Sequence, residues 1–161
     1  MTNLINAATR DGFGQGLLEI AQADTSSKIV GLCADLTGSL RMTEFQKKFP
    51  KQFIQVGVAE QNLIGTAAGL ALGGKLPFAA SFAAFSPGPD GASHQMLEDI
   101  AMMRALPNMT VIQPCDAQQA RQAVHALANH TGPAYLRLSR PKVKTITKKS
   151  SDFKIGKAQT L

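Results

Sequence analysis

The chain has 161 residues, of which 44% are hydrophobic and 17% are charged. This length suits one domain with a buried core, and the composition excludes wholesale disorder. The net charge of +6 arises in residues 140–161, which carry seven basic side chains and one acid. Residues 1–139 are therefore neutral overall, which argues against a nucleic-acid-binding surface. No apolar stretch is as long as a membrane span, no secretory signal is recognisable, and the two cysteines lack metal-ligand spacing. We expect a cytoplasmic protein that binds neither nucleic acid nor membrane and supplies no metal ligands.

Short β-branched runs alternate along the chain with longer stretches of helical periodicity. The expected elements, in chain order, are a helix over 5–23, strands over 28–33 and 53–58, a helix over 62–72, a strand over 77–82, a helix over 93–106, a strand over 109–114, a helix over 116–130 and a strand over 134–139. Asp116, with Gln119 three residues on, is typical of a helix N-cap and its partner. The alternation predicts an α/β fold with a mostly parallel sheet flanked by helices over residues 1–141, and a basic linker over 142–161.

Ligands of parallel α/β sheets bind at the carboxyl ends of the strands, in the loops that lead into helices. One such loop, residues 57–62, carries the lone carboxylate of Glu60 between a buried strand and an apolar helix. Partial desolvation at this place would suit a general acid or base. The alternative is an acid that only meets the helix dipole.

A second loop, residues 87–95, has the Pro, Gly and Asp residues of a rigid turn. Ser93 suits a helix N-cap, which would place His94 at the helix start; the alternative is a surface histidine without a role. Arg137 and Arg140 flank the last expected strand, where an arginine meets either an anionic ligand or a surface carboxylate.

Three blocks of sequence occur in an order that is far more specific than any one loop. They are FIQVGVAEQNLIGTAAGLAL at 53–72, PDGASHQMLEDIAMMRALPNMTVIQPCDAQQA at 89–120 and GPAYLRLSRP at 132–141. Together they closely resemble the pyrimidine-binding domain of transketolases, from about residue 6 to the basic segment. The resemblance is greatest to the split or short bacterial transketolases, whose carboxyl-terminal half is a separate chain. It implies the fold of thiamine diphosphate-binding pyrimidine domains.

Transketolases use thiamine diphosphate, and the resemblance implies which residues contact this cofactor. Glu60 matches the catalytic glutamate that hydrogen-bonds the ring nitrogen of the aminopyrimidine, while the cofactor acts as electron sink. Phe85 corresponds to the aromatic residue that stacks on the pyrimidine, with Phe82 beside it; core packing of the two rings is the alternative. Asp35 matches a residue near the cofactor at the subunit interface.

The resemblance also implies substrate contacts. Asp90 and His94 match the family's Asp-Gly-x-x-His-Gln block, which contacts substrate hydroxyls and assists proton transfer. Arg10, Ser39 and Arg140 match positions that bind the phosphate of sugar-phosphate substrates.

Parts of a complete transketolase are expected outside this chain. The diphosphate- and magnesium-binding motif belongs to an amino-terminal domain, so we expect a diphosphate-domain partner subunit in a homo- or hetero-oligomer. The chain ends where the linker to a carboxyl-terminal domain is expected. Within the domain, Gly88 is followed directly by Pro89, where the family has roughly thirty further residues, about one strand–helix repeat.

The expected activity is that of a transketolase-type transferase subunit, which moves a two-carbon ketol unit between sugar phosphates. Deoxyxylulose phosphate synthases are an alternative, although they typically carry His at the positions of Asn62 and Gln95. The beta subunits of 2-oxo-acid dehydrogenases share the glutamate but not the blocks around it. A further alternative is a catalytically inactive fragment that acts only in assembly.

Overall fold

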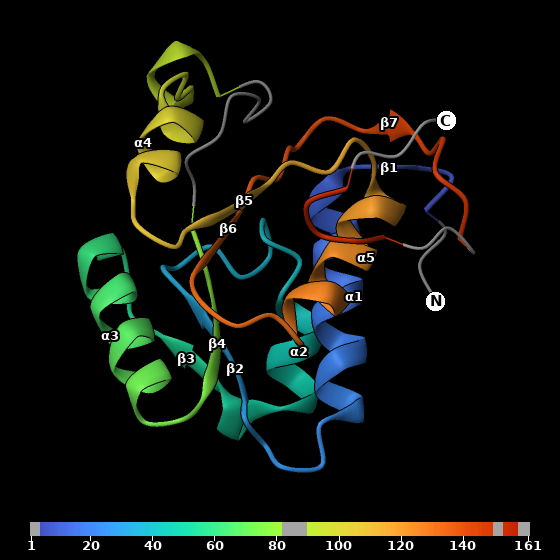
Figure 1. Ribbon diagram of the computed structural model, residues 1–161. Coiled ribbons are helices and arrows are strands. Elements are labelled where there is room, and N and C mark those ends of the chain that lie inside the picture. The colour runs from blue at the N-terminus through green and yellow to red at the C-terminus, as the bar shows by residue number, and fades with distance from the viewer. Residues whose placement is uncertain (1–3, 82–89, 150–152, 158–161) are drawn as a thin grey trace. The chain divides into compact units, whose positions relative to one another are not determined.

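The computed structural model describes residues 4–81, 90–149 and 153–157 of the chain (Figure 1). The chain divides into two compact units. One unit consists of residues 1–16 and 82–161 and is called the discontinuous unit; the other, Leu17–Ser81, is called the inserted unit. The inserted unit is thus an insertion in the sequence of the discontinuous one.

The inserted unit is built on a parallel sheet of three strands. Strand β2 (Ile29–Cys33) lies between β3 (Phe53–Gln55) and β4 (Leu76–Ala80). Leu32 is in register with a residue of each neighbouring strand. All of β2 is buried, as expected of a central strand in a parallel sheet whose two faces are both covered.

Helix α3 (Glu60–Leu72) covers one face of this sheet (Figure 1). It buries Leu63 against Val30 and Leu32 of the central strand. Burial of a side chain of this size contributes about 2 kcal/mol. The apolar residues of β2 therefore hold α3 in place.

Helix α2 (Thr43–Lys48) and a short 3-10 turn (Pro50–Gln52) precede β3. Phe45 is the buried residue of α2. A Cβ atom built on Gly31 would lie 2.8 Å from the Phe45 ring, so a side chain at this position would displace the ring from the strand. Because successive strand residues point to opposite faces, Gly31 and Leu32 serve different faces of the sheet.

The discontinuous unit holds two strand pairs among its described residues. Strands β5 (Thr110–Ile112) and β6 (Ala134–Leu136) are parallel, whereas β1 (Asn6–Ala7) and β7 (Val143–Lys144) are antiparallel. The expected basic linker over 142–161 therefore begins with a strand that pairs within this unit.

Helix α5 (Ala117–Leu127) begins at its predicted N-cap. Asp116 Oδ1 accepts a hydrogen bond of 2.8 Å from the Gln119 backbone N–H, and Gln119 Oε1 accepts one of 2.8 Å from the Cys115 N–H. The predicted cap is confirmed, although the returning bond reaches one residue further back than the capping-box pattern requires.

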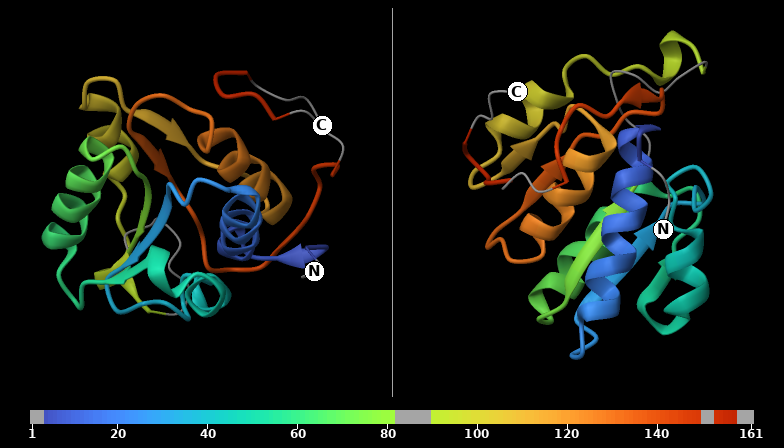
Figure 2. Two further views of the ribbon diagram at one scale, coloured as in Figure 1. Left: turned by 90° about the horizontal axis from the view of Figure 1, so that it is seen from below. Right: turned by 90° about the vertical axis from the view of Figure 1, so that its right-hand side faces the viewer.

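The first half of helix α1 (Thr9–Ala23), which belongs to the discontinuous unit, lies next to α5 (Figure 2). A Cβ atom at Gly12 would lie 1.8 Å from the Ala117 carbonyl oxygen, and one at Gly16 would lie 3.0 Å from Val124 Cβ. These glycines, which sequence propensity treats as weak points of a helix, allow the two helices to approach each other closely.

The predicted α/β fold with parallel strands and covering helices is confirmed, although most elements are shorter than expected, among them α5 and strands β3, β5 and β6. Two helices also begin later. The helix expected over 5–23 begins only at Thr9, because residues 6–7 pair with β7. The helix expected over 93–106 is reduced to α4 (Asp99–Ala105), preceded by a 3-10 turn at Ala92–His94. Among the described residues, no helix combines the length and the apolar character needed to cross a bilayer.

Candidate active site

Three predicted site residues follow strands of the inserted unit's sheet. Asp35 and Ser39 come after β2, and Glu60 comes after β3. Because β2 and β3 are parallel, their following loops leave from the same edge of the sheet. Asp35 has a φ of 59°, a left-handed conformation that Asp adopts more readily than most residues.

A glutamine that the sequence analysis did not single out joins the two loops. Gln55, the last residue of β3, accepts a 2.7 Å hydrogen bond from the Asp35 N–H and donates one of 3.2 Å to Thr37 Oγ1. It therefore fixes the loop after β2 against the end of β3. A long polar side chain inside the otherwise apolar run expected as a strand over 53–58 is the signal that could have indicated this role.

Glu60 is the first residue of α3 and follows a turn at Gly57, whose φ is 73°. Its side chain is exposed, and the Ser81 hydroxyl donates a long hydrogen bond of 3.4 Å to Glu60 Oε1. The side chain of Val58, close by in the sequence, is 80% exposed. The expected partial desolvation of Glu60 is therefore not found: the described residues of this unit leave the carboxylate accessible.

Asp90 and Arg140, both predicted to bind substrate, bind each other in the discontinuous unit. Arg140 Nη1 donates to Asp90 Oδ2, and each side chain is 27% exposed. This is the carboxylate alternative that the sequence left open for Arg140. A substrate phosphate that reached Arg140 would compete with this ion pair.

His94 ends the 3-10 turn and does not begin a helix, so its predicted position at a helix start is wrong. Ser93 caps no helix in the described part of the chain either: its hydroxyl lies 3.1 Å from His94 Nδ1, and α4 begins after Glu98 without a side-chain cap. The chain leaves the turn at Gln95 in an extended conformation, which separates the turn from α4. The His94 imidazole is exposed.

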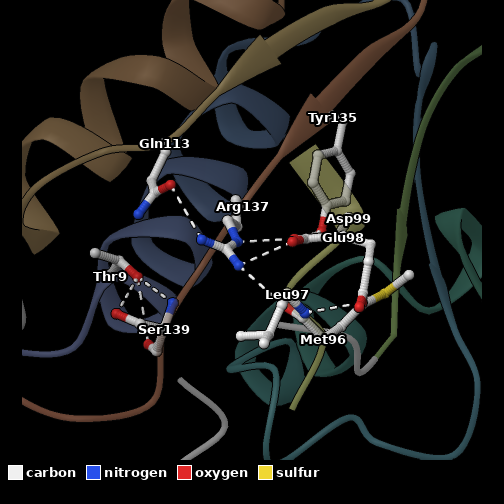
Figure 3. Close-up of polar contacts among 9 residues, drawn as sticks. All are labelled: Thr9, Met96, Leu97, Glu98, Asp99, Gln113, Tyr135, Arg137 and Ser139. Carbon is white, nitrogen blue, oxygen red and sulfur yellow. Dashed lines mark hydrogen bonds and ion pairs between the residues drawn. The ribbon is translucent and has the colours of Figure 1, made fainter. Parts of the chain in front are cut away.

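Arg10 lies in the first turn of α1. It follows Thr9, which contacts Ser139, the residue before Arg140. The Ser139 N–H donates a hydrogen bond of 2.6 Å to Thr9 Oγ1, and the two hydroxyls are 3.2 Å apart (Figure 3). Arg10 follows Thr9 and Arg140 follows Ser139, so these bonds bring together the backbone at two predicted phosphate-binding positions.

A buried polar network surrounds Arg137 (Figure 3). Its Nε and Nη2 donate to the two oxygens of Asp99 at 2.7 and 2.8 Å, and the Tyr135 hydroxyl donates to Asp99 Oδ2 at 2.7 Å. Nη1 donates to Gln113 Oε1 and Nη2 to the Met96 carbonyl, each at 3.2 Å. Arg137 is 9% exposed and Asp99 is 1% exposed. The partner of Arg137 is thus neither an anionic ligand nor a surface carboxylate but a buried one.

This network sets the protonation of the tyrosine. Burial raises the pKa of Tyr135 far above its ordinary value, and the hydrogen bond to Asp99 and the negative charge of that carboxylate raise it further; the positive charge of Arg137 opposes them in part. Tyr135 is therefore a protonated donor at neutral pH and still at the ordinary tyrosine pKa of 10.0.

Phe82 and Phe85, the predicted cofactor-stacking pair, lie outside the described residues. Within residues 4–81, 90–149 and 153–157, no three His, Cys, Asp or Glu side chains gather as ligands for a metal ion.

The family model of the transketolase pyrimidine-binding domain matches this chain over residues 6–87 and 86–145. The two matched pieces meet beside Gly88, the position at which the sequence indicates missing residues. The alignments to two relatives extend over 181 and 184 positions, more than the 161 residues of this chain, so the relatives have residues that this chain lacks.

Two relatives are subunits of transketolases. The chain is 38% identical to the 6-deoxy-6-sulfo-D-fructose transketolase subunit SqwH of Clostridium sp. (strain MSTE9), with 94% of this chain and 56% of the relative covered. It is 34% identical to a subunit of the apulose-4-phosphate transketolase of Phocaeicola vulgatus, with 96% and 58% covered.

A solved structure described as a split gene transketolase, in an inactive β4 tetramer, superposes with a TM-score of 0.82 at 41% identity, covering 94% of this chain and 57% of that one. The chain thus spans somewhat more than half the length of these relatives. The family model covers most of its residues, from 6 to 145. The chain belongs to the family of transketolase pyrimidine-binding domains.

Proposed function

We propose that this chain is the pyrimidine-domain subunit of a thiamine diphosphate-dependent transketolase, which transfers a two-carbon ketol unit between sugar phosphates. The observation that carries the proposal is the position of Glu60, the first residue of α3 in the AEQN block, with an accessible carboxylate where the chain leaves β3. Membership of the transketolase family supports the reaction class, whereas the identity of the sugars is part of the proposal.

The exposure and the hydrogen bonding of the residues around Glu60 support its proposed contact with an aminopyrimidine ring. The carboxylate is exposed and has a long bond of 3.4 Å from Ser81, which a stronger donor can replace. Val58 and Ile64 are exposed apolar side chains on either side of Glu60 in the sequence, at 80% and 63% exposure. Glu60 would hydrogen-bond the ring nitrogen and hold a proton there, while apolar contacts exclude water from the pair.

When bound, thiamine diphosphate supplies the electron sink for breaking a carbon–carbon bond of the ketose. Phe85 and Phe82 are proposed to pack on its pyrimidine ring, and Asp35 to lie near it at the subunit interface. Its diphosphate and Mg²⁺ are proposed to bind the partner's diphosphate domain, since the described residues offer no cluster of metal ligands.

Asp90 and His94 are proposed to contact the hydroxyls of the sugar, with His94 moving a proton through its exposed imidazole. Arg10, Ser39 and Arg140 are proposed to bind the sugar's phosphate. In this role Arg140 exchanges the carboxylate of Asp90 for the phosphate, which carries more charge and can accept both arms of the guanidinium.

The proposed partner is a diphosphate-domain subunit, in an oligomer with this chain. Two relatives described as subunits, and a split-gene relative whose β4 tetramer is described as inactive, support a need for a second kind of chain. The accessible carboxylate of Glu60 supports the same arrangement, because a proton-exchanging acid works best where water is excluded.

The test is thiamine diphosphate binding, with Mg²⁺, to this chain mixed with the diphosphate-domain subunit of its own organism. Glu60→Gln should weaken binding about ten- to a hundredfold, because a hydrogen bond to a charged group contributes about 1.5–3 kcal/mol. Titration calorimetry measures the dissociation constant. The control is Glu44→Gln, the same change at an exposed glutamate that pairs with Lys47 in the same unit.

Wild-type affinity in the Glu60→Gln complex would refute the assigned role of Glu60. The break in the family match at residues 86–87 favours one alternative, an assembly subunit without turnover. A wild-type complex that forms but binds no thiamine diphosphate would establish that alternative instead.

A further inference from the structure

Helix α4 differs from the other described helices in what it buries. Asp99, its first residue, is its only fully buried residue, and it carries a charge. Met102 in the middle of the helix and Leu106 just after it are 47% and 48% exposed. Ile100 and Met103 are partly buried and none of its apolar residues is fully buried, so the hydrophobic effect attaches this helix less firmly than a helix with a fully buried apolar face. The carboxylate of Asp99 adds three directional bonds to this attachment.

The bonds accepted by Asp99 come from strand β6 and the residue that follows it. Tyr135 donates one of them, and the guanidinium of Arg137 donates two in a forked arrangement (Figure 3). Such a fork fixes both the distance and the orientation of the two groups, which a point charge such as lysine does not. The position of α4 is therefore set by Arg137.

Arg137 also holds the loop before α4. Its Nη2 donates to the carbonyl of Met96 at 3.2 Å, and Met96 lies two residues after His94. On the other side, the chain continues from Arg137 to Arg140, which pairs with Asp90. One buried guanidinium thus links the end of the segment that carries Asp90 and His94 with the segment that carries Arg140.

Stability alone is a poor reason for this arrangement. Replacing a buried ion pair with apolar residues of similar size is often neutral or stabilising, whereas breaking it by removing one partner costs about 3–5 kcal/mol. The pair is better explained by the geometry that it imposes: it fixes the segment that carries Asp90 and His94 relative to the segment that carries Arg140.

We infer that Arg137, together with Asp99, is a positioning residue that holds residues 90–96, with Asp90 and His94, in register with Arg140 for binding of a phosphorylated sugar. This inference rests on the proposed function. Arg137 itself contacts no substrate; it acts through the Met96 carbonyl and the attachment of α4.

The experiment uses the full chain, alone and with the diphosphate-domain subunit. The main variant is Asp99→Leu/Arg137→Met, which removes both charges and avoids leaving either one buried alone. The conservative variant is Arg137→Lys, which keeps the charge but not the fork. The control is Glu44→Leu/Lys47→Met, which removes an exposed ion pair from α2.

Amide hydrogen exchange of the chain alone reports on the segment. The double variant should melt close to wild type, while residues 94–105 exchange about tenfold faster and the strands of the inserted unit are unchanged. Exchange at the wild-type rate in residues 94–105 would overturn the inference. A third variant, Arg137→Met alone, leaves Asp99 buried without its partner. If this variant unfolds globally while the double variant exchanges at the wild-type rate, the pair is purely structural and the inference is overturned.

Kinetics of the complex separate positioning from folding. With a saturating aldose phosphate as acceptor of the two-carbon unit, both Asp99→Leu/Arg137→Met and Arg137→Lys should raise KM for the donor D-fructose 6-phosphate about tenfold. The dissociation constant of thiamine diphosphate should stay within about twofold of wild type. A wild-type KM in Arg137→Lys would mean that charge alone suffices and that the fork positions nothing. If the wild-type complex turns over no sugar, the proposed function fails, and the exchange of residues 94–105 alone decides whether Arg137 holds the segment.

Discussion

Helices α4 and α5 belong to the same unit and are attached by opposite means. Helix α5 buries six residues, all but one of them apolar: Ala117, Gln118, Ala120, Ala123, Val124 and Leu127. Helix α4 fully buries only Asp99, and its apolar Ile100 and Met103 are partly buried. Apolar contacts, which hold α5, tolerate small shifts of the helix. The directional bonds of Asp99, which hold α4, do not tolerate them.

The difference bears on what each helix does. A helix attached by apolar area serves as a scaffold, and α5 carries no predicted site residue. A helix attached by a forked ion pair fixes the orientation of the loop that leads into it, and the loop before α4 carries His94. Substitutions at the contacts of each helix test the two modes of attachment, from the largest expected effect to the smallest.

Breaking the apolar attachment of α5 should have the largest effect. Gly12→Ala would place a Cβ atom 1.8 Å from the Ala117 carbonyl oxygen, so one helix backbone must move away from the other. We expect a loss of about 3 kcal/mol in the free energy of unfolding, at the upper end for overpacked sites. Urea unfolding followed by circular dichroism measures it.

The control for this change is Gly65→Ala in α3. No atom lies within 4 Å of a Cβ built at Gly65 among the described residues, so alanine should raise stability by about 0.5–1 kcal/mol through its helix propensity. Equal effects of the two substitutions would show that helix propensity, and not the contact between α1 and α5, governs position 12.

Asp116→Asn should have an intermediate effect, about 2 kcal/mol, because Asp116 both caps α5 and binds the following segment. Its carboxylate accepts bonds from the Gln119 N–H, from the Ile146 and Thr147 N–H groups and from the Thr147 hydroxyl. Burial opposes ionisation of Asp116, but these bonds outweigh it and lower its pKa from the ordinary 3.8.

The sign of the pH dependence follows from this lowered pKa. The stabilisation by Asp116 is complete above the unfolded-state pKa and is lost as the pH falls through the lower, folded-state pKa. The difference between wild type and Asp116→Asn in urea unfolding should therefore be constant near pH 7 and shrink below pH 3.8. A difference that persists unchanged at lower pH would mean that the ionised carboxylate contributes nothing.

Tyr135→Phe should have the smallest effect, about 1 kcal/mol, because Asp99 keeps the two bonds from Arg137. The parent chain offers a direct optical test, since Tyr135 is its only tyrosine and it has no tryptophan. Tyrosinate absorbance should not develop near the ordinary pKa of 10.0 while the chain is folded. In Asp99→Asn it should develop at lower pH than in wild type; an identical titration would contradict the bond between Tyr135 and Asp99.

Local patterns in the sequence were sufficient to predict a buried strand and the cap of a helix. The buried strand β2 was predicted within one residue, and the capping of α5 follows from the spacing of Asp116 and Gln119. Helix α2 was missed because it is short and polar and buries only Phe45. Strands β1 and β7 have two residues each, too few for any periodicity.

The candidate site was predicted less completely, because its key contacts join residues far apart in the chain. No local pattern relates Asp99 to Arg137, or Asp90 to Arg140, and the ion pairs exist only in the folded unit. Exposure of Glu60 was likewise not readable from its apolar flanks, since which side of α3 is covered depends on tertiary packing. The site roles themselves remain predictions from the family resemblance.

The pairing of β1 with β7 has a consequence for the order of events during synthesis. The inserted unit consists of consecutive residues, so all of its chain is available for folding once Ser81 has left the ribosome. The discontinuous unit cannot close until Val143 and Lys144 emerge and meet residues 6–7. Contacts of such long sequence separation form slowly. During synthesis, the whole inserted unit is therefore available for folding before residues 6–7 can pair with β7.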